Sequence, residues 1–443
     1  MKRVCVVFLL GVFLALSSVA QSAFDLISYN RNFSASNYCV YPDNRLPELT
    51  PPPAGKKPFY ISHYGRHGSR YLSNRKAYEI PYRTLSKADS LGKLTTLGKK
   101  VKDELEFIIK GTEERWGDLT GIGKQQQRAI ARRMVERFPE VFDGNAFIDA
   151  KSTTVTRCVL SMGSCVQQLS VMNPKPRVTM DASASDMWYM NHQDRQLRSI
   201  MMTREAKKFY NDYCDPLNHN PRLMELLFND SAYATKYGDE VWTNYYLIKA
   251  AGIQQNTHMN TTSKLFDLFT YEDIYQYWKK ENIWWYINYG FSPLSGGHQP
   301  YSQRYLLRKI ISEADSCMSL KANGASLRFG HETVILPLCC LLGIRPAKAG
   351  TYYVSKGFDL KTDNFEDLEP AGWWACMVFP MAANIQFVFY RAHPLDRDVV
   401  FKVLLNEREA TLPIPTDIAP YYHWNDFRDH YLQLIDAYEQ NKK

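Results

Sequence analysis

Strand-like and helical segments are distributed unevenly along this chain, and this distribution constrains the fold more than any other feature of the sequence. Short runs of β-branched and aromatic residues, typical of strands, occur at 59–63, 153–156, 325–330, 373–379, 385–390 and 399–405. Between about 195 and 315 the pattern is instead mostly helical and aromatic. The strands must share one core to bury their faces. The sequence therefore predicts an α/β domain interrupted by an inserted α-helical domain.

Size and charge exclude several classes of protein. The chain has 443 residues, 45% of them hydrophobic, which is enough for two or three structural units and excludes a disordered or fibrous protein. Lys and Arg number 54 against 46 Asp and Glu, a net charge of +8, but the excess is spread along the chain. No block of like charges marks a nucleic-acid-binding tail. This diffuse basic balance favours a small anionic substrate over nucleic acid.

The N-terminus has the three zones of a secretory signal peptide. Basic residues 2–3 precede an apolar run at 4–16, and small residues follow at 17–20. A membrane anchor needs about 20 apolar residues, and this run is shorter. Cleavage after Ala20 would remove Lys2 and Arg3 and lower the net charge from +8 to +6. We therefore expect a protein exported to a periplasm or secreted, with no stable membrane insertion of the mature chain.

The cysteines leave the disulfide pattern open. Removal of Cys5 with the signal peptide would leave eight of the nine cysteines, an even number that permits disulfides in an exported protein. Cys158 and Cys165 are seven residues apart in a predicted helix, which is too far for a bridge between them. No spacing of Cys and His suggests a metal site, so we expect no metal.

The string at 64–70, Tyr-Gly-Arg-His-Gly-Ser-Arg, carries the clearest chemistry, because it directly follows the first predicted strand. Arg66 and Arg70 can grip phosphate oxygens with paired N–H groups, and Gly68 lets the backbone approach a ligand. Their positive charge disfavours protonation of His67, which keeps the imidazole nucleophilic. The alternative is a solvated surface loop with no function. The position after a hydrophobic strand favours a phosphate site.

These residues resemble the histidine acid phosphatase family, branch two of the histidine phosphatases, whose signature is RHGxR. Residues 119–127 are similar to the family's LTxxGxxQ helix, and Thr156-Arg157 matches a further clamp position. Residues 327–333, Leu-Arg-Phe-Gly-His-Glu-Thr, match the second histidine site. The resemblance implies that Arg157 and His331 bind phosphate and that Glu332 is the proton donor.

The acid after His331 bears on the branch of the family. Other members carry His-Asp here and the multiple inositol-polyphosphate phosphatases carry His-Ala-Glu, whereas this chain has His-Glu with nothing between. Segments at 269–278, 285–293 and 381–386 look most like the inositol-polyphosphate phosphatase group. The alignment of Glu332 with the proton donor therefore remains open, while that of His67 with the nucleophile does not.

The resemblance implies a fold and a mechanism. The fold would be a mixed-sheet α/β sandwich with an inserted, mostly helical cap. The expected units are a signal peptide at 1–20, an N-terminal arm at 21–58, an α/β phosphatase domain at 59–195 and 316–443, and a cap at 196–315. His67 would attack phosphorus and form a phosphohistidine, while Arg66, Arg70, Arg157 and His331 hold the phosphoryl oxygens. Glu332 would protonate the leaving oxygen, with no cofactor or metal.

Three functions are compatible with these motifs. The first is an exported phosphatase of inositol polyphosphates such as phytate, and the second is an acid phosphatase with a broad range of monoesters. The third is a phosphate-ligand binding protein without turnover, which the presence of both His67 and Glu332 disfavours. Several further cations could contact outlying phosphates, namely Arg195, Arg198, Lys279, Lys280, His298, Arg304 and Arg308. The sequence leaves the oligomeric state open.

Overall fold

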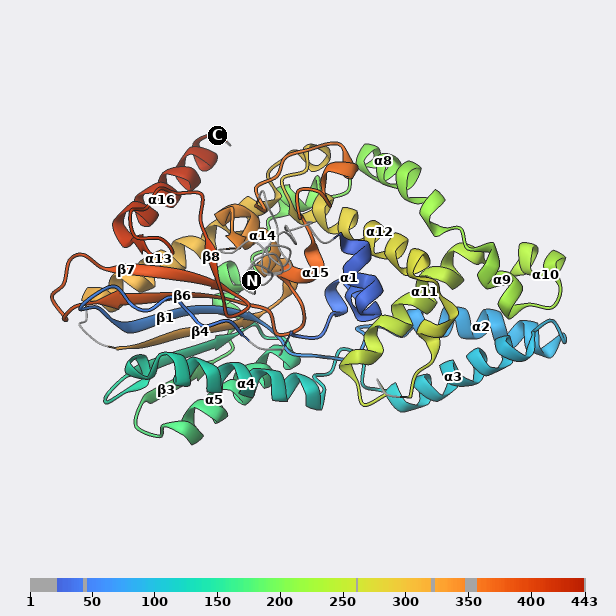
Figure 1. The fold of residues 1–443 in the computed structure, drawn as a ribbon, viewed down its shortest axis with the longest axis horizontal. Helices are drawn as coiled ribbons and strands as arrows, with labels where there is room; N and C mark the ends of the chain where they lie inside the picture. The colour runs from blue at the N-terminus through green and yellow to red at the C-terminus, as the bar shows by residue number, and fades with distance from the viewer. Residues whose placement is uncertain (1–21, 43–45, 260–261, 320–322, 347–356, 442–443) are drawn as a thin grey trace, which may run out of the picture.

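The chain has two halves that lie side by side in the computed structural model: a sheet covered by helices, and an assembly of helices (Figure 1). The structure describes residues 22–42, 46–259, 262–319, 323–346 and 357–441. The predicted signal peptide lies outside these residues. Within them, no helix is both long and apolar enough to cross a membrane.

One mixed sheet of nine strands forms the centre of the first half, with strand order β3-β2-β4-β1-β6-β7-β8-β5 and β9 paired to β7. The strands are β1 (Lys57–Arg66), β2 (Phe147–Ser152), β3 (Arg177–Asp181), β4 (Gly324–Gly330), β5 (Arg345–Pro346), β6 (Asn384–Arg391), β7 (Val400–Leu405), β8 (Arg408–Thr411) and β9 (Tyr422–His423). Strands β1 to β4 pair in parallel, whereas β6 pairs antiparallel to both β1 and β7. The described fold is therefore the predicted mixed α/β class.

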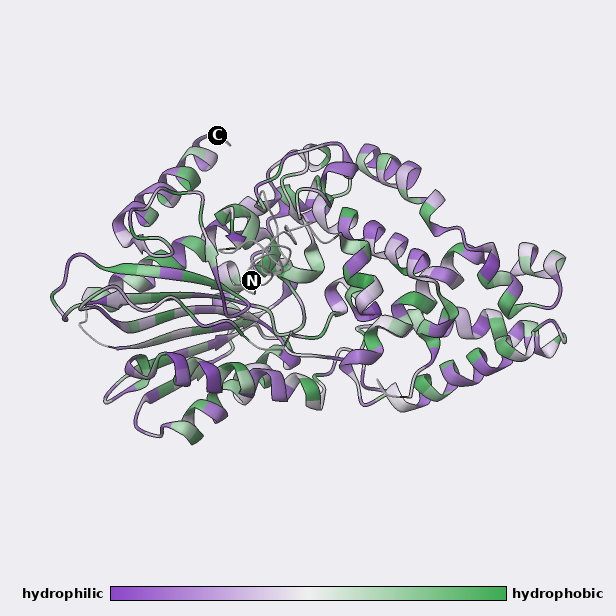
Figure 2. Ribbon diagram, viewed as in Figure 1, coloured by the Kyte–Doolittle hydropathy of each residue, from purple (hydrophilic) through white to green (hydrophobic). Residues whose placement is uncertain are grey.

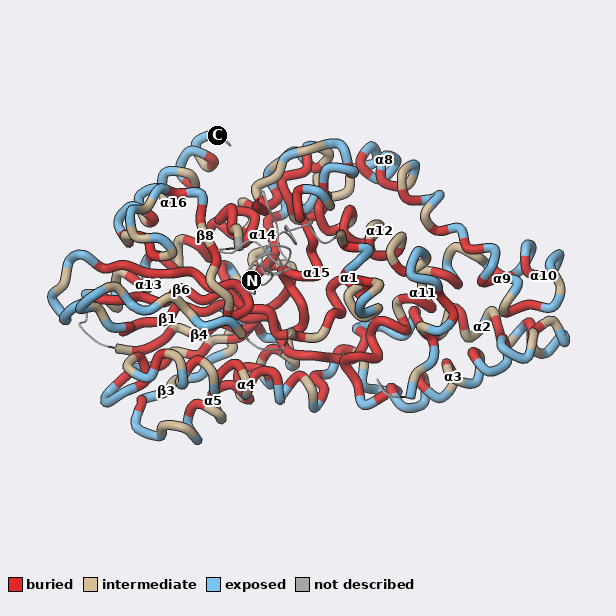
Figure 3. The backbone as a smooth tube through the Cα atoms, viewed as in Figure 1, coloured by how far each residue is buried: buried red, intermediate tan, exposed pale blue. Residues whose placement is uncertain are grey.

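Helices cover both faces of this sheet (Figure 1). Helices α4 (Gly121–Arg137) and α5 (Thr156–Met172) pack on one face, where Ile61 and Val388 point. Helices α13 (Arg304–Ser319), α14 (Glu332–Leu342) and α16 (Trp424–Gln440) cover the other, where Tyr60 and Phe389 point. Alternation of neighbouring residues between the faces is the two-residue period of a strand. Figure 3 accordingly shows the central strands buried between exposed helix surfaces.

The second half, called the helical half below, contains α1–α3 and α8–α12. Their bounds are α1 (Ala23–Tyr29), α2 (Lys76–Ser90), α3 (Thr96–Thr112), α8 (Arg204–Cys214), α9 (Pro221–Leu227), α10 (Ser231–Tyr237), α11 (Glu240–Ile253) and α12 (Tyr271–Tyr289). Leu85, Leu105, Leu247 and Trp278 meet in one buried cluster. Figure 2 shows that hydrophobic and hydrophilic residues alternate along these helices. Since α2 and α3 pack with α9 and α11, the helical half draws on two separate parts of the chain. The predicted domain boundaries stay a prediction.

Short helices link these elements. They are α6 (Met187–Met190), α7 (Arg195–Ser199), α15 (Ala375–Val378) and the 3-10 segment η1 (Arg31–Tyr38), with further 3-10 turns η2 (Pro139–Phe142), η3 (Ala184–Asp186), η4 (Pro216–Asn218), η5 (Gln254–Asn256), η6 (Leu265–Leu268), η7 (Pro293–Ser295), η8 (Gln299–Gln303) and η9 (Phe365–Asp367). In the described chain the eight cysteines after Cys5 are free thiols. Cys158 and Cys165 both lie on α5, as predicted.

Two predicted strands are wrong, and the others are confirmed with bounds that differ by at most three residues. The run at 153–156 connects β2 to α5 and includes Thr156, the first residue of α5, because the chain leaves the sheet after Ser152. The run at 373–379 contains α15, where Trp373 and Trp374 pack edge-on against aromatic rings of α12. Buried aromatic residues fit either element, and tertiary packing decides between them.

Candidate active site

Adjacent parallel strands bring the predicted motifs to one edge of the sheet. In the β1–β4 register Arg66 pairs with Gly330, so His67 and His331 are the next residues on neighbouring strands. The His67 N–H donates to the Gly330 carbonyl oxygen at 2.9 Å, and the two imidazole centroids lie 5.8 Å apart. Strand β2 pairs with β4 on the other side and leads to Arg157 at the start of α5. The carboxyl ends of parallel strands are a common place for ligand sites.

Helix α4 supports the turn that carries His67. Gly68 lies against Gly123 so closely that a Cβ atom at Gly68 would be 2.3 Å from the Gly123 carbonyl oxygen. The Gln127 side chain donates from Nε2 to the Arg66 carbonyl oxygen at 2.9 Å. The motif at 119–127 therefore acts through packing and hydrogen bonds that hold the turn.

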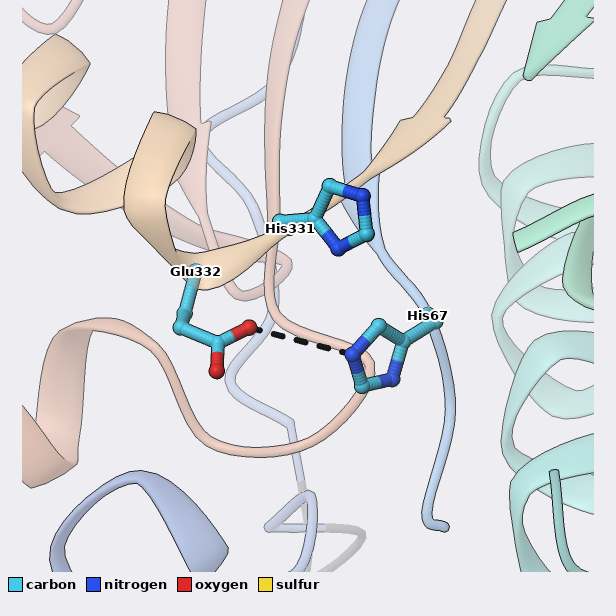
Figure 4. Close-up of side chains that lie close together, drawn as sticks. All are labelled: His67, His331 and Glu332. Carbon is cyan, nitrogen blue, oxygen red and sulfur yellow. Dashed lines mark ion pairs between the residues drawn. The ribbon is translucent and has the colours of Figure 1, made fainter. Parts of the chain in front are cut away.

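His67 has the protonation that a nucleophile needs. Its Nδ1 lies 2.9 Å from the Gly68 carbonyl oxygen, which can only accept, so Nδ1 carries the proton and Nε2 keeps its lone pair. Burial and the neighbouring Arg66 guanidinium hold the pKa of His67 well below its usual range. Nε2 faces the Glu332 carboxylate, with Oε2 at 3.7 Å (Figure 4).

Arginines surround this imidazole. Arg66 donates from Nη1 to the backbone oxygens of Asn37 at 2.7 Å and Phe379 at 2.6 Å, and Arg70 lies over the Tyr38 ring at 5.4 Å. Burial lowers the pKa of Arg66 to about 10, so it stays charged near neutral pH. Among the described residues, Arg66 Nη2, Arg70 Nε and Arg157 Nε are buried and have no hydrogen-bond partner. Such unsatisfied donors suit an anion.

Arg157 belongs to the same cluster of charge. Burial, followed by the positive charge of Arg70, lowers the pKa of Arg157. Arg157 in turn disfavours protonation of His67 and lowers its pKa, after larger effects of burial and of the other two arginines. The structure therefore brings all three arginines of the predicted clamp around His67.

Glu332 is the first residue of α14 and lies between the arginines. Its Oε2 is 3.0 Å from Arg66 Nε, and its Oε1 is 4.0 Å from Arg70 Nη2. Burial alone would raise the pKa of this carboxyl, but Arg66 and Arg70 outweigh it and hold the pKa well below the usual value. A phosphate dianion between these groups would offset the positive charge and raise the pKa of Glu332. A bound anion therefore favours the protonated form of this carboxyl.

His331 completes the ring around the site. Its Nε2 is 3.2 Å from the Thr153 hydroxyl, and the Cys158 thiol lies 3.8 Å from the same nitrogen. Burial lowers the pKa of His331 to about 4. The imidazole is therefore neutral near pH 7 and would contact phosphate by hydrogen bonding.

His67, His331 and Glu332 are also of types that can bind a metal ion. Ligand atoms of His67, His331 and Glu332 lie within 4.8 Å of one another. The charges of Arg66, Arg70 and Arg157 oppose a cation at this point. The residues therefore fit an anion better than a metal ion.

A cavity of about 1010 Å³ opens beside Glu332, lined by Asn37, Tyr38 and Thr333 near the site. Three helices of the helical half each contribute a lysine to the lining of this cavity: Lys207, Lys249 and Lys280. Three carboxylates also line it: Asp215, Asp239 and Glu281. A smaller cavity of about 290 Å³, lined in part by Arg198, shares Tyr289 and Thr333 with the first. The site thus has room for a substrate larger than one phosphate.

The other predicted cations divide into two groups. Lys280 and Arg198 line the cavities, whereas Arg304 and Arg308 form ion pairs with carboxylates that include Glu439, and Lys279 pairs with Glu366. His298 packs beside the Tyr438 ring, and Arg195 is exposed on α7. Lys280 and Arg198 therefore lie where they could contact a substrate.

Sequence reasoning missed contributions from two other segments. Asn37 and Tyr38 come from the N-terminal arm, which carries no recognisable motif. Ala383 accepts the Arg66 backbone N–H at 2.7 Å, and Ala382 donates to the His67 carbonyl oxygen at 2.9 Å. The run at 381–386 could have indicated the second contribution, since it carries part of the resemblance.

Comparisons with known proteins find relatives of this chain. The profile of the histidine phosphatase superfamily (branch 2) matches residues 65–406. Multiple inositol polyphosphate phosphatase 1 of Gallus gallus is 21% identical over 328 residues, 70% of this chain and 70% of that protein. The Homo sapiens protein of the same name is 21% identical over 354 residues, 74% of this chain and 68% of its own length.

Solved structures share the fold. A multiple inositol polyphosphate phosphatase of Bifidobacterium longum, in complex with inositol hexasulfate, has a TM-score of 0.71 at 16% identity and covers 88% of this chain and 96% of its own. A phytase from D. castellii has a TM-score of 0.61 at 14% identity, with 91% and 84% covered. Because the profile spans most of the chain and includes both histidine motifs, the chain belongs to the histidine phosphatase superfamily, branch 2.

Proposed function

We propose that this phosphatase hydrolyses inositol polyphosphates through a phosphohistidine on His67. One observation carries the proposal: the free lone pair of His67 Nε2 faces a carboxyl group inside a ring of three arginines. This arrangement combines a nucleophile, an acid and anion-binding donors in one place. The relatives named as inositol polyphosphate phosphatases support the choice of substrate.

In the first step, His67 Nε2 forms a bond to phosphorus while the bond from phosphorus to the ester oxygen breaks. Arg66, Arg70 and Arg157 hold the other phosphoryl oxygens as charge develops on them. Glu332 gives its proton to the departing oxygen. An inositol alkoxide is a poor leaving group, so this proton transfer matters more for it than for an aryl phosphate.

In the second step, water attacks phosphorus and the N–P bond breaks. The Glu332 carboxylate accepts the proton of this water, which restores the acid for the next cycle. His67 regains its lone pair, and inorganic phosphate leaves the arginines. The chemistry draws only on side chains that the described site brings together.

The large cavity supports a substrate with several phosphates. Lys249 donates to the Tyr245 hydroxyl at 3.2 Å and Lys280 to the Asn218 side chain at 2.8 Å. Each ammonium group has three N–H donors and uses one of them in this bond to a neutral partner. Both lysines can therefore still bind an anion. The body of an inositol polyphosphate would lie in this cavity with one phosphate on His67.

Export from the cytoplasm is part of the proposal, because residues 1–20 have the zones of a signal peptide. The mature protein should begin at Gln21. N-terminal sequencing of protein from the native host tests this, and an intact Met1 on folded protein would contradict it.

The test of function is phosphate release by purified protein from inositol hexakisphosphate and from small monoesters. We expect a higher kcat/KM with the hexakisphosphate than with the small monoesters. Equal or higher kcat/KM with simple monoesters would instead support a broad acid phosphatase. Tight phosphate binding without turnover of any ester would support a binding protein.

A further inference from the structure

Asn37 and Tyr38 reach the active site from outside the part of the chain, 65–406, that matches the family. The Asn37 side chain donates from Nδ2 to Glu332 Oε1 at 3.2 Å, and its backbone oxygen accepts from Arg66. The Tyr38 ring lies against the Arg70 guanidinium. One dipeptide therefore contacts three of the six predicted site residues.

The backbone before Asn37 is strained. Ser36 is buried and has φ 52° and ψ −122°, a conformation that non-glycine residues rarely adopt. Such strain persists where surrounding contacts fix the chain. Here two hydrogen bonds fix the residues that follow. The Asn256 side chain donates to the Tyr38 carbonyl oxygen at 2.6 Å, and the Met381 N–H donates to the Cys39 carbonyl oxygen at 2.8 Å. The strained residue directs Asn37 towards Glu332.

We propose that Asn37 is a positioning residue for Glu332, holding the carboxyl group in the orientation from which it protonates the leaving oxygen. The inference rests on the proposed role of Glu332. Asn37 and Glu332 Oε1 both border the site, and Asn37 also lines the cavity where the substrate would lie. With Oε1 held by the amide, the Oε2 oxygen stays on the side of His67, where the ester bond breaks.

The amide also affects when Glu332 holds its proton. An N–H donor stabilises the ionised carboxyl, so loss of Asn37 should raise the pKa of Glu332. The other charged or titratable groups that interact with Glu332 come from four elements. They are Tyr64, Arg66, His67 and Arg70 from β1 and its turn, Arg157 and Cys158 from α5, His331 from the end of β4, and Tyr289 from α12. All of these remain in an Asn37 variant, so a change in the pH profile reports on the amide.

The experiment compares Asn37→Ala, Asn37→Asp and the control Asn32→Ala on inositol hexakisphosphate and p-nitrophenyl phosphate. Asn32 lies in the same segment, and its hydrogen bonds to Asn30, Cys39 and Gln255 use its backbone. We expect Asn37→Ala to lower kcat about ten-fold on the inositol ester and much less on the aryl ester. The ratio of the two rates in one preparation does not depend on the folded fraction, so partial unfolding cannot produce this result.

The pH profile supplies a second readout. Glu332 must be protonated to act, so a raised pKa extends kcat on the inositol ester to higher pH. The alkaline limb of the profile, where the rate falls, should move to higher pH in Asn37→Ala. It should move further in Asn37→Asp, because the added carboxylate repels the ionised form of Glu332. Asn32→Ala should leave both the limb and the rate ratio unchanged.

A Glu332→Gln background separates the role of Asn37 from that of Glu332. If Asn37 acts through Glu332, adding Asn37→Ala to Glu332→Gln should cause no further loss on the inositol ester. Three results would overturn the role of Asn37 and leave that of Glu332 intact. They are equal losses of rate on both esters, an alkaline side of the pH profile that does not move, and a loss that persists in Glu332→Gln. If Glu332→Gln itself slows both esters equally, Glu332 is not the proton donor and both assignments fail.

Discussion

His67 and Glu332 lie in the same field of positive charge, and this field acts on their chemistry in opposite ways. Arg66 and its neighbours keep His67 neutral, as a nucleophile requires, but they also keep Glu332 ionised when no anion is bound. A bound phosphate dianion offsets the arginine charge next to Glu332 and favours its protonation. The acid therefore becomes available together with the substrate that needs it.

Replacing His67 tests the nucleophile. His67→Ala should lower kcat by about 10³-fold or more while phosphate still binds, because the arginines remain. Phosphate release and calorimetric titration with inorganic phosphate measure the two properties. His393→Ala is the control, since His393 is exposed just after β6, whose end pairs with the start of β1 away from the site. A tenth of the normal rate in His67→Ala would disprove the assignment.

The acid side of the pH profile tests the charge state of His67. Because burial and Arg66 lower its pKa, the imidazole should stay neutral as pH falls through 6.5, its ordinary value. We expect kcat/KM on p-nitrophenyl phosphate, corrected for ionisation of the substrate, to persist at pH values well below 6.5. An activity that halves near pH 6.5 would show that His67 has an ordinary pKa.

At the scale of elements, the site depends on how α4 meets the end of β1. Gly68 and Gly123 let the two backbones touch, and Gln127 ties α4 to Arg66. Sequence could predict this turn and strands β1 and β4, and it placed six candidate site residues in motifs of the family, whose catalytic and binding roles stay predictions. It could not predict Asn37, since no motif surrounds it and only the folded arm brings it to Glu332. It also misplaced 153–156 and 373–379, where β-branched and aromatic residues serve a connection and a helix.

Alanine at Gly68 tests this contact. Gly68→Ala forces a Cβ atom against the Gly123 carbonyl oxygen, so it should lower the free energy of unfolding by about 1–3 kcal/mol and reduce activity. Gly163→Ala is the matched control, because nothing lies within 4 Å of a Cβ at that helical position. It should raise the free energy of unfolding by about 0.5–1 kcal/mol. Urea unfolding measures both, and a neutral Gly68→Ala would contradict the described packing.

At the scale of the whole molecule, the helical half supplies the lysines of the cavity and the sheet half supplies the arginines around His67. Lys207, Lys249 and Lys280 come from α8, α11 and α12. The chain as a whole is also basic, with a net charge of +8. A substrate with several phosphates would gain from both features, whereas a sugar monophosphate would use the arginines alone.

Salt should therefore reduce the preference for a polyanion. Ions screen charges over about 8 Å at physiological ionic strength. We expect the ratio of kcat/KM for inositol hexakisphosphate over glucose 6-phosphate to exceed one at low salt and to fall as salt is added. Lys249→Gln should lower this ratio, and Lys208→Gln, an exposed lysine paired with Asp212 on α8, should not. A ratio that salt and Lys249→Gln leave unchanged would show that the cavity does not select for charge.

The phosphohistidine on His67 can be tested directly by trapping the phosphorylated enzyme. Protein mixed with radiolabelled phosphomonoester and quenched within milliseconds should carry an acid-labile label, and mass spectrometry of a digest at alkaline pH should locate it on His67. We expect this label in the native protein, its absence in His67→Ala, and its accumulation where the second step is slowed. A native protein that releases phosphate rapidly with no label on His67, or with the label on another residue, would contradict a phosphohistidine on His67.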